Sequence, residues 1–368
     1  MAVRIEQIRA PSPSPSRLLG LDVARSIAML GMFVSHYGAH ILDRPERRWP
    51  SSVVRFTDGR AMPLFVMLSG AGLVFLCRRP NAWVRVLSRA VILLLVGLWL
   101  EGGLVAVILH FYALYLVLGL LVVRLPKSYW LTLAFVVTAI GAWIRIYAVD
   151  DLPKPFAITD DSWWSALPHL GHPRLLLSHL LFTGIYPAFP TMAFFLVGMW
   201  VARLDLRSPI TQRRLMAGGL TMAIIGYAIG WSTDDHRERL AVDSTSAWRW
   251  LSAAGHSEMP AWIFGTTGVS LTVIGACLWM SPRLPVATLP FARAGQLALT
   301  FYVAHVLLLR RGLRHWPWHM SPPSILAAIA GLFAVFVVVA YVWRARMAHG
   351  PAEAILRVAD GVVATTTR

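Results

Sequence analysis

Apolar stretches long enough to cross a membrane recur along the whole chain. Hydrophobic residues make up 57% of the 368 residues, and charged residues only 14%. Crossing the hydrocarbon core of a bilayer takes about 20 apolar residues in a helix. The sequence therefore predicts an all-α polytopic membrane protein embedded in the lipid bilayer, a bundle of about ten transmembrane helices over residues 19–41, 61–77, 88–105, 107–123, 129–148, 186–202, 214–231, 261–280, 294–310 and 324–343.

The charge balance predicts how the bundle is oriented. The formal net charge is +16, but the basic residues stand between apolar stretches, so they indicate membrane orientation and not binding to nucleic acid. Lys and Arg are densest in the segments that lie on one side, which predicts both termini in the cytosol. We expect a disordered cytosolic leader at 1–17, the bundle at 18–345 and a cytosolic tail at 346–368, in the inner (plasma) membrane. The sequence leaves the oligomeric state open.

Two ionisable residues stand inside the first predicted helix. Arg25 and His36 are eleven positions apart, and eleven steps of about 100° bring both side chains to one face. Asp22 and His40 lie near the same stripe. An ionisable group at the centre of an inserted helix costs roughly 2.5–3.5 kcal/mol, so it needs a partner or a function. Chemistry within the membrane is one interpretation; for Arg25, a structural ion pair with Asp22 is the other.

A carboxylate is also predicted at membrane depth. Glu101 stands between tryptophan and glycine residues with no cation next to it in the sequence. We interpret it as a catalytic or acceptor-orienting group, with Arg145 or Asp150 as possible partners. The motifs HExxH and GxGxxG and a CxxC pair are absent from the sequence. We therefore expect no metal and no permanently bound cofactor.

Three motifs resemble the acyltransferase 3 family of integral-membrane acyltransferases. LDVARSIAMLGMFVSH (21–36) is similar to the first-helix motif of that family, and PLFVMLSGAGLVF (63–75) to its second-helix signature. LTFYVAHVLL (299–308) resembles a late helix with a matching tyrosine and histidine, Tyr302 and His305. YPAFPTMAFFLVGMWVAR (186–203) and HGPAEAILR (349–357) look more like a sister branch, the YeiB-like proteins with the DUF418 domain and the heparan-α-glucosaminide N-acetyltransferases.

The resemblance implies acyl transfer from cytosolic acyl-CoA, a co-substrate, to an acceptor at the far face. A hydroxyl or amine that attacks a thioester must lose a proton, and a neutral imidazole is a natural base. His36 would be that base or would take the acyl group itself; the alternative is a histidine that is hydrogen-bonded in the core. His40, Tyr302 and His305 are candidates for substrate binding, with core packing as the alternative for His305.

Donor binding is predicted on the cytosolic side of the bundle. Arg25 suits a phosphate or a pantetheine carbonyl. Arg85 and Arg89 share a helix face after the second helix, where the family has an arginine-rich motif, and would balance the phosphates of CoA; alternatively, they are an orientation signal beside anionic lipid. Ser69 and Gly70, with Gly72, permit close helix packing or leave room for the pantetheine arm.

These observations favour an acyltransferase that moves a short acyl group, such as acetyl, to a hydroxyl or amine of an extracytoplasmic glycan, lipid or small molecule. Two long segments on the expected outer side, 149–185 and 232–260, hold tryptophans, aspartates and histidines that include His172 and His256, and they suit a polar acceptor or interfacial cover. A multi-pass transporter or flippase is the alternative, although the inverted repeats typical of transporters are not visible. A non-catalytic assembly or sensor protein is the third hypothesis.

Overall fold

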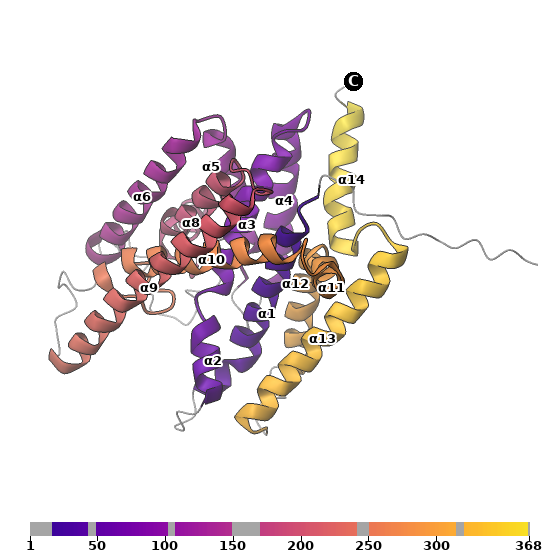
Figure 1. Cartoon of the computed structure of the whole chain (residues 1–368). Helices are drawn as coiled ribbons and strands as arrows, with labels where there is room; N and C mark the ends of the chain where they lie inside the picture. Colours follow the sequence, from indigo (N-terminus) through magenta and orange to yellow (C-terminus); the bar gives the residue numbers. More distant parts are fainter. Residues whose placement is uncertain are drawn as a thin grey trace, which may run out of the picture.

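The computed structural model describes residues 17–42, 49–101, 107–148, 170–240, 250–313 and 320–366. Every helix predicted from the sequence has a counterpart in it (Figure 1). These counterparts are α1 (Leu19–Leu42), α3 (Ala61–Leu76), α4 (Ala82–Leu100), α5 (Leu109–Val122), α6 (Lys127–Trp143), α8 (Ala188–Val201), α9 (Pro209–Leu240), α10 (Pro260–Met280), α12 (Ala298–Leu308) and α13 (Pro322–Arg346).

The sequence did not predict four further helices: α2 (Trp49–Thr57), α7 (Pro173–Ser178), α11 (Pro285–Gly295) and α14 (Pro351–Thr366). Three short π-helical segments, η1 (Ile144–Ala148), η3 (His179–Thr183) and η5 (Leu309–Leu313), extend α6, α7 and α12. The described residues contain no strand. The all-α fold class is therefore confirmed.

The count of ten spans is not confirmed. Among the described residues, six helices are long and apolar enough to cross a membrane, or seven if α11 and α12, which meet at 63°, form one broken span. The first of the six combines α2 and α3 into Trp49–Leu76. The apolar helices α5 and α8 have only 14 residues each, fewer than the about 20 that a full crossing needs.

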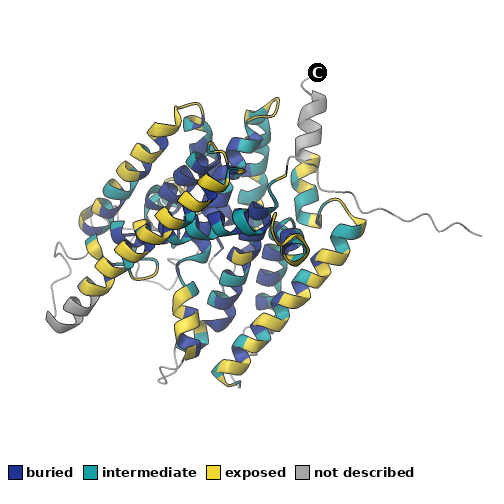
Figure 2. Cartoon of the chain, in the orientation of Figure 1, coloured by how far each residue is buried: buried dark blue, intermediate teal, exposed yellow. Residues whose placement is uncertain are grey.

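The core lies where α1, α3, α8 and α10 pack together, and the outer helices present apolar side chains outward. Figure 2 shows buried residues at the centre and exposed residues along the outer sides of α6, α9 and α13. Many of these exposed residues are apolar, such as Phe135, Ile224 and Val338. A large apolar outer surface is expected where lipid replaces water as the solvent, so this protein is a membrane protein.

Two glycines let α3 and α8 approach closely. A side chain at Gly70 would clash with the carbonyl oxygen of Phe195, and one at Gly198 with the carbonyl oxygen of Met67. The predicted role of Gly70 in close helix packing is therefore confirmed. At Gly72, two positions further along the same helix, there is nothing within 4 Å of where a side chain would begin.

Candidate active site

Two histidines from distant parts of the sequence meet inside the bundle. The Nδ1 atom of His36 on α1 lies 3.1 Å from the Nε2 atom of His305 on α12. The two rings stack with centroids 5.3 Å apart. The ring of Phe33 also stacks with the His305 ring, with centroids 5.3 Å apart, and the Tyr37 hydroxyl donates a hydrogen bond to the His305 carbonyl at 3.3 Å. The histidine pair is therefore held in one geometry by α1.

Tyr302 lies on α12 one turn before His305. Its hydroxyl accepts a hydrogen bond from the Ile108 amide at 3.0 Å, and its ring lies 5.1 Å from the His305 ring. The Nδ1 atom of His305 is buried and faces the carbonyls of Phe301 and Tyr302 without a well-formed hydrogen bond. The pairing of His36 with His305 was not predicted, because the two residues stand far apart in the sequence.

A buried carboxylate organises the N-terminal end of α1. Asp22 accepts hydrogen bonds from Arg17 at 2.7 Å and from Arg25 at 2.5 Å. The amide of Gln296 donates to the same carboxylate at 3.3 Å, and Arg344 donates to the Gln296 carbonyl at 2.8 Å. The predicted ion pair between Asp22 and Arg25 is confirmed. It links α1 to α11 and α13 through charge-assisted hydrogen bonds.

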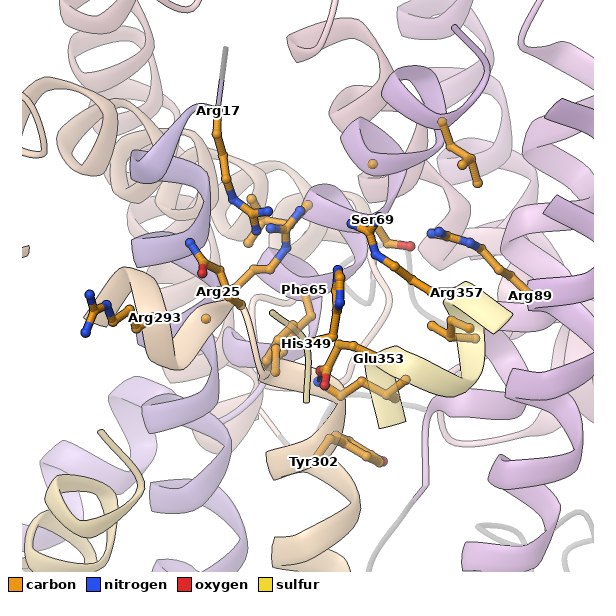
Figure 3. Close-up of a pocket in the computed structure, with 18 of the residues that line it drawn as sticks. Arg17, Arg25, Phe65, Ser69, Arg89, Arg293, Tyr302, His349, Glu353 and Arg357 are labelled. Atoms are coloured by element: carbon orange, nitrogen blue, oxygen red, sulfur yellow. Dashed lines mark hydrogen bonds between the residues drawn. The ribbon is translucent and has the colours of Figure 1, made fainter. Parts of the chain in front are cut away.

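A cavity of about 990 Å³ opens beside this cluster. In Figure 3 the side chains of Arg25, Arg89 and Arg357 lie near Ser69, and Tyr302 lies apart from them, at the bottom of the view. Of the predicted site residues, the cavity brings together four: Arg25, Ser69, Arg89 and Tyr302. Its lining does not include the other five: His36, His40, Arg85, Glu101 and His305. Among these five, His305 connects to the cavity through its contact with Tyr302.

A second cavity, of about 710 Å³, adjoins the first and shares Arg17, Arg25, Gly72 and Arg89 with it. Its lining adds Arg78, Arg79 and Arg207 and contains the carboxylates of Asp22 and Asp205. This end of the bundle therefore concentrates positive charge around an opening. Within the described ranges, no three or more His, Cys, Asp and Glu side chains gather as a metal site would require.

The C-terminal helix α14 supplies part of the cavity wall. His349, just before it, and Glu353 and Arg357 on it line the cavity. Glu353 accepts hydrogen bonds from the amides of Leu299 and Thr300, at 2.8 and 3.1 Å, and from the Thr300 hydroxyl at 2.5 Å. The carboxylate thus satisfies amides at the start of α12 that have no partner within the helix. The sequence predicted only a tail here.

Arg85 and Arg89 share a face of α4 but meet different surroundings. Arg89 lines both cavities. Arg85, one turn earlier, donates from Nε to the carbonyl of Pro80 at 3.1 Å and lies outside both linings. Position along the helix therefore separates them: the turn that Arg89 occupies faces α14 and α3, whereas Arg85 lies beside the loop that starts α4.

Of the two partners predicted for Glu101, the structure places Arg145 elsewhere. The Glu101 carboxylate lies 3.4 Å from His110 Nε2, and the two side chains are 1% and 0% exposed. Arg145 instead pairs with Glu258 at 3.7 Å, and Asp150 lies outside the described residues. The reason is the antiparallel return of the chain: α5 begins shortly after α4 ends, and Gly97 allows the His110 backbone to approach.

His40, on the last turn of α1, is partly buried.

Glu258 lies in the loop before α10, outside the membrane-spanning helices. Burial raises the pKa of its carboxyl to about 8, against the opposing charge of Arg145. An unfolded Glu has a pKa of about 4.3, so the folded state favours the protonated form. This stabilisation is complete below about pH 4 and is lost as the pH rises towards 8. We expect the thermal unfolding temperature in detergent to fall between pH 5 and pH 9.

The matched variant for this prediction is Glu258→Gln, which keeps the shape of a protonated carboxyl and does not titrate. Its unfolding temperature should depend less on pH than that of the wild type over the same range. Equal pH dependence of the two proteins would contradict the assignment to Glu258.

Together, the apolar helical bundle, the histidine pair of α1 and α12 and the arginine-lined cavity define an integral-membrane protein with a candidate active site within its helices. The chain belongs to the acyltransferase 3 family: a model of that family, described as an acyltransferase domain, matches residues 18–344. This match supports acyltransferase activity in general. No curated protein matches the chain significantly. The match ends before α14, so that helix adds cavity-lining residues from outside the family domain.

Proposed function

We propose that this protein transfers a short acyl group, in particular acetyl, from cytosolic acyl-CoA to a hydroxyl or amine of an extracytoplasmic glycan, lipid or small molecule, as a multi-pass protein of the inner (plasma) membrane. One observation carries the proposal: His36 pairs with His305, and His305 contacts Tyr302, which lines a cavity that several arginines also line. The family match does not favour the alternative of a transporter or flippase.

The shape and charge of the cavity support an acyl-CoA donor. CoA carries phosphate groups on one end and a narrow pantetheine arm that ends in the thioester. Arginine guanidinium groups bind phosphates through paired hydrogen bonds, and Arg25, Arg89 and Arg357 line the cavity. The open space at Gly72 and the neighbouring Ser69 leave room for the arm. In this arrangement the thioester points towards Tyr302.

The hydrogen bond between the histidines supports a general-base mechanism. In the proposed tautomer His305 carries its proton on Nδ1, which leaves His305 Nε2 as the acceptor in its hydrogen bond with His36. His36 then donates from Nδ1 and keeps a lone pair on Nε2. That atom takes the proton of the acceptor while its oxygen or nitrogen attacks the thioester carbonyl carbon. The new bond forms, the carbon–sulfur bond breaks, and the proton passes to the thiolate of CoA.

The same Nε2 atom could attack the thioester first, with an acyl-histidine as the intermediate. In our proposal transfer is direct, and single-turnover experiments with labelled acetyl-CoA distinguish the two routes. Label that stays on the protein when acceptor is left out would establish the two-step route. Glu101 remains a proposed participant that acts through His110, because its carboxylate faces that ring and both side chains are buried.

A substitution at Gly72 tests the proposed donor site. Gly72→Leu places an isobutyl group in open cavity space, so we expect the Kd for acetyl-CoA to rise at least tenfold, about 1.4 kcal/mol, without loss of the fold. The matched control is Gly331→Leu, which adds the same group on the exposed face of α13, also with nothing within 4 Å. Binding is measured by isothermal titration in detergent. Equal affinity in both variants would place the donor elsewhere.

A further inference from the structure

The proposed reaction has two substrates, and the donor cavity accounts for only one of them. The residues that line this cavity reach Tyr302 but do not include His36. An acceptor from the opposite side of the membrane therefore needs its own contacts near His36. This requirement rests on the proposed function, in which His36 is the base.

The segment beside His36 is the break between α2 and α3. Asp58, Gly59 and Arg60 form a turn that interrupts the span Trp49–Leu76, and Gly59 has a φ of +67°. The residues on either side of this turn pack against α1 on either side of His36. A side chain at Gly31, before His36, would stand 3.1 Å from Ala61, which follows the turn. A side chain at Gly38, after His36, would stand 3.0 Å from Val54, which precedes the turn. The turn therefore lies alongside the part of α1 that carries His36.

A third histidine reaches this turn from the loop before α10. His256 has a left-handed backbone with a φ of 59°, and its Nε2 atom lies 3.5 Å from the Asp58 carboxylate. Gly255 packs directly against Asp58. Besides His305, the groups that act electrostatically on His36 are His256 and Asp58. His36 therefore has His305 as its hydrogen-bond partner in the bundle, and a second histidine, paired with a carboxylate, lies within electrostatic range of it.

The pair of Asp58 and His256 is partly exposed, and buried aromatic rings pack against its histidine. The side chains of His256 and Asp58 are 31% and 41% exposed. Behind them, the buried rings of Tyr186 and Trp262 lie 5.7 and 6.1 Å from the His256 ring. Arg60 uses one guanidinium nitrogen on the backbone carbonyls of Arg55, Phe56 and Asp58. These hydrogen bonds of Arg60 stabilise the turn that carries Asp58.

We infer that Asp58 and His256 bind the acceptor, a hydroxyl compound, and present it to His36. A carboxylate accepts a hydrogen bond from a hydroxyl, and the imidazole serves a neighbouring hydroxyl as donor or acceptor. A polyol such as a sugar satisfies both groups at once. An amine fits poorly, because the carboxylate stabilises its protonated form, which has no lone pair for the attack. The pair therefore selects oxygen acceptors over nitrogen acceptors.

The test uses the full-length protein in envelope membranes of cells that make it, with radiolabelled acetyl-CoA as the donor probe. The membranes supply the acceptor, and mild alkali distinguishes the products, since it releases acetyl from esters and leaves amides intact. We expect the label to be alkali-labile. Asp58→Asn and His256→Gln should each lower label incorporation at least tenfold, whereas the Kd for acetyl-CoA stays within twofold of the wild type.

Two further variants distinguish a loss of acceptor binding from a loss of the fold. Asp58→Glu retains the carboxylate and should recover part of the activity lost in Asp58→Asn. His172→Gln changes an exposed histidine before α7 and should incorporate label as the wild type does. Alkali-stable label, or wild-type incorporation by Asp58→Asn, would overturn the inference. A wild-type protein that binds acetyl-CoA but transfers no label would instead overturn the proposed function itself.

Discussion

Replacing His36 with glutamine is expected to lower the rate of acyl transfer by about two to four orders of magnitude. A positioned general base contributes roughly 10²- to 10⁴-fold to a reaction rate, and glutamine can hydrogen-bond to His305 but cannot take a proton at physiological pH. The measurement is incorporation of label from acetyl-CoA into envelope material, with membranes that contain equal amounts of wild-type protein and variant.

Donor binding is the internal control for this experiment. Because His36 is not among the residues that line the cavity, the Kd of His36→Gln for acetyl-CoA should equal that of the wild type. A variant that binds the donor normally but does not transfer would separate chemistry from folding. Undiminished transfer would remove His36 from the mechanism, and weaker donor binding would indicate that the cavity depends on the histidine pair.

Replacing Arg89 with glutamine should raise the Kd for acetyl-CoA about 10- to 100-fold. Hydrogen bonds to charged groups contribute about 1.5–3 kcal/mol each, and every 1.4 kcal/mol corresponds to a factor of ten in affinity. Because salt screens charges near an open cavity, the difference between wild type and variant should shrink as the ionic strength rises. Titration of the purified protein with acetyl-CoA at two salt concentrations measures both effects.

Arg214 offers the matched control for this substitution. It is exposed near the start of α9 and lines neither cavity, so Arg214→Gln removes the same charge without touching the proposed site. Its affinity for acetyl-CoA should stay within twofold of the wild type. A loss of equal size in both variants would mean that overall positive charge, and not a contact from Arg89, attracts the donor.

Much of the helical architecture could be predicted because membrane helices follow local rules. Apolar length predicted where the helices lie, and the charged residues of α1 indicated that its buried face has a special role. The ion pair of Asp22 with Arg25 followed from their spacing on one helix. The close approach at Gly70 followed from the small-residue pattern.

The features that could not be predicted from the sequence all depend on contacts between distant segments. Nothing local to His36 or His305 predicts that their rings meet, since this depends on how α12 packs against α1. The contact of Glu101 with His110 was missed, and Arg145 was expected beside Glu101, because hydropathy gives no register between neighbouring helices. The separation of α11 from α12 by a 63° bend was missed since the apolar stretch is continuous. Arg85 and Arg89 share a face of one helix, and only the packing of the cavity wall beside α14, which includes Arg89 and not Arg85, distinguishes them.

The hydrogen bonds of Glu353 to the start of α12 have a consequence for truncated forms of the chain. Without α14 the first amides of α12 lack this acceptor, and the cavity loses the wall that Glu353 and Arg357 supply. A chain cut before α14 therefore keeps the residues of its histidine pair but no longer encloses the space beside them.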